Sequence, residues 1–265
     1  MAFLPLLKDV QGMGQLLQRP GVFAESAKMP VFFVGHKDFS KTPRLTPFTK
    51  SLRSMGASVK PSSILVISAH WLTLGDPYVT VNTSFTTPEY PSKGSPETAK
   101  TLVELASVKE EYRGLDHGAW SVLRHIAPGA DIPVLQLSID MEKPLDYHYQ
   151  LARQLRPLRD KGVLIIGSGN IVHNLELSAL KFWSKKPYDW AVEFDQWAKN
   201  RIDERDFTSL FSYYKLGRIA DLAVPTLDHY IPMLYCLALC DLNENITHTY
   251  EELNRGGSFR CFRIG

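Results

Sequence analysis

Histidine is the residue type whose number and placement in this chain best fit catalytic chemistry. The 265 residues contain eight histidines, at positions 36, 70, 117, 125, 148, 173, 229 and 248. Neutral imidazole is a common ligand for zinc, iron and similar metals, and it also transfers protons near neutral pH. Three such ligands that leave coordination positions open make a catalytic rather than a structural metal site.

Five of these histidines share a local context that the other three lack. His36, His70 and His173 each follow a short apolar run, His117 lies in a glycine-bounded loop, and His229 opens a predicted helix. The remaining three lie within helical or polar segments, and we interpret them as structural. A single histidine is more often structural than catalytic, so the hypothesis of a metal site rests on the five together.

The stretch from Gly162 to Leu175, GVLIIGSGNIVHNL, presents one of these histidines most clearly. Its β-branched apolar run predicts a strand that is buried on both faces. Gly167 and Gly169 then permit a backbone path that residues with a Cβ resist. His173 follows, and this stretch alone leaves two interpretations open: a histidine that acts on a metal-bound substrate, or a hydrogen-bonded structural histidine.

Apolar runs alternate with helical periodicity along the chain, which predicts an α/β fold. The pattern indicates one domain with a mostly parallel central sheet flanked by helices. Open sheets of this kind bind ligands at the carboxyl ends of their strands, so the active site is expected there. We expect an N-terminal extension over residues 1–28 and a catalytic domain over residues 29–265. The predicted strands are 30–34, 63–68, 78–82, 133–138, 163–166 and 258–264, and the predicted helices are 46–55, 96–106, 120–126, 145–159, 189–207 and 225–239.

Composition and missing motifs exclude several classes of protein. Charged residues make up 22% of the chain, the net charge is +2, and no basic stripe suggests binding to nucleic acid. The apolar start is too short for a signal peptide or a membrane span, and three cysteines fit a reducing compartment, so we expect a cytoplasmic protein. There is no HExxH, CxxC, Walker or GxSxG motif, and the GSGN stretch does not complete GxGxxG.

Six segments of the chain, in this order, resemble the class III extradiol ring-cleaving dioxygenases, and within them the group that cleaves DOPA. The resemblance covers about residues 30 to 265, nearly the whole chain. It rests on PVFFVGH (30–36), ILVISAHW (64–71), LDHGAWSVL (115–123), IPVLQLSID (132–140), GSGNIVHNL (167–175) and PTLDHYIPMLY (225–235).

This resemblance implies a role for each of the five histidines. His36, His70 and His229 would hold the metal, and His173 would be the acid/base residue beside it and a candidate fourth ligand. His117 would act from the substrate side. The family's metal is Fe(II), held by two histidines and a carboxylate, whereas the DOPA group has histidine at the third position. The implied substrates are a small catechol and dioxygen.

The three-histidine set has an electrostatic consequence that follows from its chemistry alone. Three neutral imidazoles leave a divalent centre at about +2, whereas a carboxylate ligand would reduce this to about +1. The more positive centre should attract a catecholate strongly. It should also accept Zn(II), which binds such ligands more tightly than Fe(II). The resemblance implies Fe(II) as the cofactor, and the chemistry of the three imidazoles lets Zn(II) occupy the site.

Two residues are candidates for binding the substrate, and two segments depart from the family pattern. Lys37 can pair with a substrate carboxylate, or be a solvated loop charge. Asn170 can contact the substrate or orient His173, or cap the turn. The family usually has His-Gly-Ser-Pro where this chain has His-Lys-Asp-Phe (36–39), and the segment 83–94 is shorter than its counterpart. Both segments would border the substrate.

Two other functions remain open on the sequence. A zinc-dependent hydrolase could use the same all-histidine site. A non-catalytic binding protein could keep the same fold while its altered loops bind a partner. The expected assembly is a monomer or a small homo-oligomer.

Overall fold

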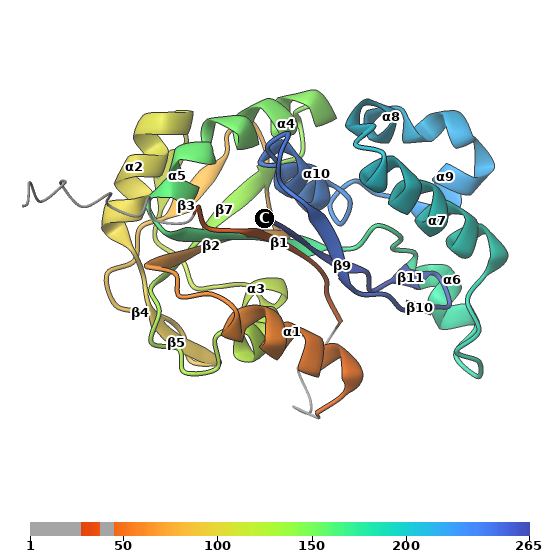
Figure 1. Ribbon diagram of the computed structural model, residues 1–265, viewed down its shortest axis with the longest axis horizontal. Coiled ribbons are helices and arrows are strands. Elements are labelled where there is room, and N and C mark those ends of the chain that lie inside the picture. Colours follow the sequence, from red (N-terminus) through yellow and green to blue (C-terminus); the bar gives the residue numbers. More distant parts are fainter. Residues whose placement is uncertain (1–27, 38–44) are drawn as a thin grey trace, which may run out of the picture.

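An eight-stranded sheet forms the centre of the molecule in this computed structural model, which describes residues 28–37 and 45–265 (Figure 1). Its strand order is β6-β3-β7-β2-β8-β1-β12-β9. The strands are β1 (Val31–Gly35), β2 (Ser63–Thr73), β3 (Tyr78–Thr80), β6 (Lys109–Glu111), β7 (Val134–Asp140), β8 (Val163–Gly169), β9 (Ile246–Tyr250) and β12 (Cys261–Ile264). Residues 1–27 lie outside the described part, so the N-terminal extension stays a prediction.

The centre of this sheet is parallel, as the apolar runs predicted. β7, β2, β8 and β1 pair in parallel, whereas β12 and β9 complete one edge with antiparallel pairing. Every residue of β1, β7 and β8 is buried, which is expected for strands covered on both faces. The predicted single-domain α/β fold with a mostly parallel sheet is therefore confirmed.

Helices cover both faces of the sheet and create two hydrophobic cores. Alternate residues of β1 supply them: Val31 and Phe33 pack into one core, and Phe32 and Val34 pack into the other. In Figure 1, α1 and α3 lie on one face, and α4 and α10 lie on the opposite face. The helices are α1 (Pro47–Ala57), α2 (Pro96–Ala106), α3 (His117–Ile126), α4 (Leu145–Gln154), α5 (Arg156–Asp160), α6 (Leu175–Leu180), α7 (Asp189–Asp203), α8 (Phe207–Phe211), α9 (Arg218–Ala223) and α10 (Ile231–Ala238), with a short 3-10 helix at Tyr213–Leu216.

Several predicted helices have different bounds in the structure. The helix predicted over 145–159 is divided into α4 and α5 at Leu155, two residues before Pro157, which lacks a backbone N–H to continue the first helix. The helix predicted over 189–207 ends at Asp203. The helix predicted over 225–239 begins only at Ile231, because residues 225–230 form a turn.

Two hairpins lie outside the main sheet. The first joins β4 (Phe85–Thr87) to β5 (Tyr90–Lys93), and the second joins β10 (Leu253–Asn254) to β11 (Gly257–Ser258). The hydroxyl of Tyr90 donates to the carbonyl of Ala127 at 2.6 Å, so the first hairpin is fastened to the C-terminal end of α3. In the part of the chain that the structure describes, no helix has both the length and the apolar character needed to cross a membrane.

Candidate active site

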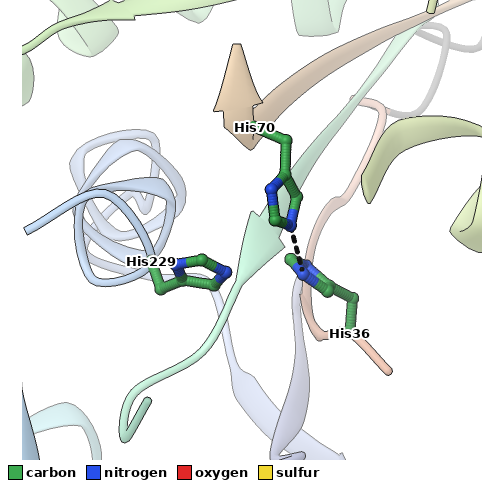
Figure 2. A group of neighbouring side chains, drawn as sticks. All are labelled: His36, His70 and His229. Atoms are coloured by element: carbon green, nitrogen blue, oxygen red, sulfur yellow. Dashed lines mark hydrogen bonds between the residues drawn. The ribbon is translucent and has the colours of Figure 1, made fainter. Parts of the chain in front are cut away.

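Three histidines from distant parts of the chain meet at the carboxyl edge of the sheet. His36 directly follows β1, His70 belongs to β2, and His229 lies in the turn before α10. One ring nitrogen from each lies within 4.8 Å of the others. Figure 2 shows the three imidazoles directed toward a common point. The structure thus brings together the three residues that the sequence predicted as metal ligands.

His70 reaches this point through an irregularity in its strand. The sequence predicted that β2 would end at Ser68, but the strand continues to Thr73, so His70 lies inside it rather than after it. The pairing of β2 with β7 shifts between Ile67 and Leu72, whereas its pairing with β8 ends at Ser68. Such irregularities redirect side chains and are frequent beside active sites.

The hydrogen bonds around His36 determine which of its nitrogens can bind a metal. Nδ1 of His36 lies 3.1 Å from the hydroxyl of Ser168, and that hydroxyl donates to the carbonyl of Gly118 at 2.7 Å. Because a carbonyl can only accept, the single proton of Ser168 is used there, and its oxygen accepts the proton of Nδ1. Nε2 of His36 therefore carries the free lone pair that a metal requires.

His229 has the same protonation pattern for a different reason. Its Nδ1 lies 2.6 Å from Oδ2 of Asp228, and a carboxylate accepts the proton. Nε2 of His229 is buried, and no hydrogen-bond partner for it exists among the described residues. A buried nitrogen with an unused lone pair is costly unless a cation or a donor reaches it.

The nitrogen atoms of this group fit a metal ion of the zinc and iron class. Nε2 of His36 lies only 3.0 Å from Nε2 of His70 (Figure 2). Because Nε2 of His36 carries a lone pair, this contact is a hydrogen bond from a proton on Nε2 of His70, and a metal ion bound by both nitrogens would take the place of that proton. The donor set of three neutral imidazoles suits zinc, iron and similar metals.

Burial keeps the imidazoles of His36 and His70 neutral, which is the form that binds metals. Burial, followed by the charges of His229 and the other site histidines, holds the pKa of His36 well below its usual value. Burial and the charges of His229 and His117 lower the pKa of His70 to about 4. In the metal-free protein near neutral pH, His36 and His70 are therefore not held in the protonated form that cannot bind a metal.

His173 lies against one of the three ligands. Its ring stacks on the ring of His229, with centroids 3.4 Å apart and planes 9° from parallel. Burial, then the charge of His229, lowers the pKa of His173 to about 3. Parallel rings at this distance do not direct their lone pairs to one point, so ligation by His173 would require its ring to turn. Its roles as acid/base residue and fourth ligand stay predictions.

His117 lies on the other side of the group, as the first residue of α3. Its ring centroid is 3.8 Å from that of His70. The side chain of Asp116 accepts from the backbone N–H of Ala119 at 2.9 Å and so caps this helix, which fixes where His117 begins it. Its catalytic role also stays a prediction.

One cavity of about 460 Å³ joins all seven residues that the sequence singled out. This volume falls within the range of roughly 300–1,000 Å³ that is usual for small-molecule sites. Its walls contain the five site histidines together with Lys37 and Asn170. The other described residues of its wall belong to α6 and the residue that precedes α6, and to the hairpin of β10 and β11. Phe259, which follows that hairpin, completes the wall.

Comparison with known proteins identifies the family. Residues 34–251 match the family described as the catalytic LigB subunit of aromatic ring-opening dioxygenase. The chain belongs to this family. The predicted resemblance to class III extradiol dioxygenases and the predicted enzyme class, an extradiol ring-opening dioxygenase, are therefore confirmed.

Several relatives of this LigB-family chain support the same assignment. The chain is 33% identical to a 4,5-DOPA dioxygenase extradiol of Escherichia coli K12, over 98% of this chain and 99% of the relative. It is 34% identical to a protein of the same name from Beta vulgaris, over 76% of this chain and 83% of the relative. A crystal structure of an uncharacterized protein from Escherichia coli K12 matches with a TM-score of 0.79 and 36% identity, covering 90% of this chain and 100% of that one.

Asn170 and Lys37, the two predicted substrate contacts, already have protein partners in this LigB-family site. The side-chain amide of Asn170 donates to the carbonyls of His36 at 3.1 Å and Ser258 at 2.8 Å, and its backbone N–H donates to the carbonyl of His229 at 2.8 Å. Nζ of Lys37 lies 2.7 Å from a carboxylate oxygen of Glu252. Both residues still line the cavity, and their contact with substrate stays a prediction.

The neighbouring Asn174 has a structural role instead. Its side chain accepts from the backbone N–H of Leu177 at 2.9 Å, which caps α6, and donates to the carbonyl of Leu222 at 2.9 Å. The contacts of Asn174 thus fix the start of α6 and join it to the end of α9.

Three residues that matter at this site were missed in the sequence. Ser168 and Asp228 contact the ligand imidazoles, and Asp116 accepts from the hydroxyl of Ser68 behind His70 at 2.8 Å. A signal for the two acids was available, because Leu-Asp-His occurs twice, at 115–117 and 227–229. Ser168 had no comparable signal, since a serine in a glycine-rich turn is common.

Proposed function

We propose that this chain is a non-haem Fe(II) extradiol dioxygenase that opens the ring of a small, DOPA-like catechol with dioxygen. The observation that carries the proposal is the convergence of three imidazoles that could hold a metal ion, together with His173 and His117, in one cavity. The names of the relatives, 4,5-DOPA dioxygenase extradiol, support this choice of substrate class.

In this proposal His36, His70 and His229 hold the metal, and His173 and His117 move protons. Ferrous iron, when bound, would supply the open positions for a catechol and dioxygen and the route by which electrons pass from the catecholate to dioxygen. A ring nitrogen of His173 takes a proton from a catechol hydroxyl, because burial keeps this imidazole neutral. The imidazolium of His173 then returns the proton during ring opening. His117 faces the reacting ring from the side of His70.

Lys37 and Asn170 are the residues that we propose to contact the substrate. Lys37 would exchange part of its interaction with Glu252 for a carboxylate on the catechol side chain. Asn170 would offer its amide from the cavity wall while holding the segments of His36 and His229 together.

We also infer that the protein works in the cytoplasm, as a monomer or a small homo-oligomer. All three cysteines are buried and unpaired, which fits a reducing compartment.

Oxygen uptake after defined metal loading tests the proposed activity. Metal-stripped protein is loaded with Fe(II) or Zn(II) without oxygen and then mixed with catechols and oxygen. We expect the iron form to consume one dioxygen per catechol and to form a yellow ring-opened product, and we expect no turnover with zinc. Absence of uptake with every catechol of the panel would contradict the proposal.

Replacement of His173 by alanine tests the assigned acid/base residue. Because positioned acid/base groups contribute roughly 10²–10⁴-fold, His173→Ala should lower kcat by about this factor. A matched control is His248→Gln, which alters a histidine that pairs with Asp203 away from the cavity and should keep normal turnover. Equal turnover of His173→Ala and the parent enzyme would remove His173 from the mechanism.

A zinc-dependent hydrolase is the second candidate, because three neutral imidazoles also suit Zn(II). Hydrolytic turnover without oxygen, supported by zinc and not by iron, would favour it over the dioxygenase.

A further inference from the structure

The imidazole of His229 differs from the other two ligands in the partner of its second nitrogen. Nδ1 of His229 lies 2.6 Å from Oδ2 of Asp228, the residue immediately before it in the chain. The side chain of Asp228 is 18% exposed, so the pair is largely shielded from water. Nε2 of His229, the nitrogen that would bind the metal, faces the other two histidines, as Figure 2 shows.

Among the residues that the structure describes, no carboxylate occupies the corresponding position at His36 or His70. Nδ1 of His36 meets the neutral hydroxyl of Ser168 at 3.1 Å. Behind His70, Asp116 is engaged with other donors: Oδ1 accepts from Ser68 and from the backbone N–H of Ala119, and Oδ2 accepts from Gln136. Among the described residues, Asp228 is therefore the carboxylate that is hydrogen-bonded directly to a ligand imidazole.

The negative charge of Asp228 lowers the net charge of the metal centre. A divalent ion with three neutral imidazoles has a charge of about +2, and a carboxylate bonded to one imidazole reduces the total to about +1. That total equals the charge of a centre with two histidines and one carboxylate ligand. A carboxylate partner also draws the Nδ1 proton toward itself and makes Nε2 a stronger donor to the metal.

We propose that Asp228 is a positioning residue that gives this three-histidine centre the charge of a site with two histidines and a carboxylate. His229 together with Asp228 takes the place of an anionic ligand, and His36 and His70 are the two neutral ligands. The inference rests on the metal site of the proposed function. It implies that Asp228 strengthens metal binding and favours the ferric over the ferrous state of bound iron.

Two neutral substitutions separate charge from mere orientation of the ring. Asp228→Asn keeps an oxygen that can accept from Nδ1, and Asp228→Ser gives His229 the kind of hydroxyl partner that His36 has. Zn(II) affinity of the full chain is measured by competition with a chromophoric chelator, and the Fe(III)/Fe(II) midpoint potential is measured on the iron form. We expect both variants to bind Zn(II) about 10- to 100-fold more weakly and to shift the potential upward.

A second aspartate–histidine pair supplies a matched control. Oδ1 of Asp203 lies 2.9 Å from Nε2 of His248, outside the cavity, so Asp203→Asn should change neither the affinity nor the potential. If either folded Asp228 variant binds Zn(II) within twofold of the parent chain at an unchanged potential, the inference is overturned. If the parent chain binds no metal, or if His229→Ala binds as tightly as the parent, the metal centre itself is wrong.

Discussion

At the scale of single residues, the site depends on what lies behind each ligand rather than on the ligands alone. A hydroxyl fixes the proton of His36 and a carboxylate fixes that of His229, so both present Nε2. The space that surrounding residues leave for each imidazole ring is as important as its hydrogen bonds. An added Cβ at Gly118 would lie 2.6 Å from Cδ2 of His70 and 2.6 Å from Oγ of Ser68, closer than real Cβ atoms come. Glycine at this position lets the His70 ring occupy its place.

Gly118→Ala should therefore weaken metal binding, because the added methyl group displaces the His70 ring or the Ser68 hydroxyl. We expect Zn(II) affinity to fall by roughly 10-fold or more, as for other changes behind metal ligands. Chelator competition measures the affinity. Gly257→Ala is the control, since its Cβ would meet Phe259 at an ordinary 3.5 Å and should leave the affinity unchanged. An unaltered affinity in Gly118→Ala would contradict this account of the glycine.

At the scale of elements, the hairpin of β10 and β11 completes the cavity, and a buried ion pair anchors the chain that follows it. Asp195 on α7 accepts from Ser258 at 2.6 Å and from Nη2 of Arg260 at 2.5 Å. The carbonyl of Ser258 in turn accepts from Asn170 at 2.8 Å. The network therefore extends from α7, through β11, to the residue that holds the segments of His36 and His229.

Asp195→Ala should destabilise the protein strongly, because it leaves the buried Arg260 guanidinium with only the half-exposed carboxylate of Glu251 as a counter-charge. The two side chains are each only 4% exposed, and removing one partner of such a pair costs about 3–5 kcal/mol. Urea unfolding measures the change in free energy. Asp76→Ala is a useful comparison, because Asp76 pairs with Lys109 on the surface and should cost no more than about 1 kcal/mol. Equal losses in the two variants would disprove the assigned role of the buried pair.

At the scale of the whole molecule, the fold buries several imidazoles in neutral form, and this burial lowers the stability of the folded state at low pH. Burial is the leading cause that lowers the pKa of His70 to about 4, of His148 to about 4 and of His173 to about 3, and it also lowers the pKa of His36. In the unfolded chain the same groups titrate near their ordinary value of about 6.5. Between these values the unfolded chain binds more protons than the folded protein, so acid favours unfolding.

The free energy of unfolding of the metal-free protein should therefore be greatest above about pH 6.5 and decrease steadily as the pH falls toward 5. Urea unfolding in the presence of a chelator, at several values across this range, measures the slope. Carboxylates contribute little there because they titrate near pH 4 in the unfolded chain. His148→Gln should make the slope shallower, whatever its effect on stability at pH 7.5. A free energy that stays constant from pH 6.5 to 5 would rule out neutral burial as the cause.

The sequence alone determined the class of fold and the set of histidines. Apolar runs predict buried strands because hydrophobic burial is a local property of each segment, and the carboxyl ends of parallel strands meet at one edge. His36 and His70 could therefore be placed together before any coordinates were known. The predicted start of α10 was wrong by six residues, although Pro232 at the second position of the helix was a usable signal for a later start.

Only the tertiary structure decided how the histidines are arranged and what supports them. The contact of Ser168 with His36 joins residues 132 positions apart, and the redirection of His70 depends on how β2 pairs with its neighbours. The stacking of His173 on His229 likewise depends on the packing of separate segments. Patterns along a chain report burial and local conformation, whereas ring orientation and proton position depend on contacts between distant residues. For that reason the sequence could name the candidate histidines, and only the fold could show which nitrogen His36 and His229 direct to the centre.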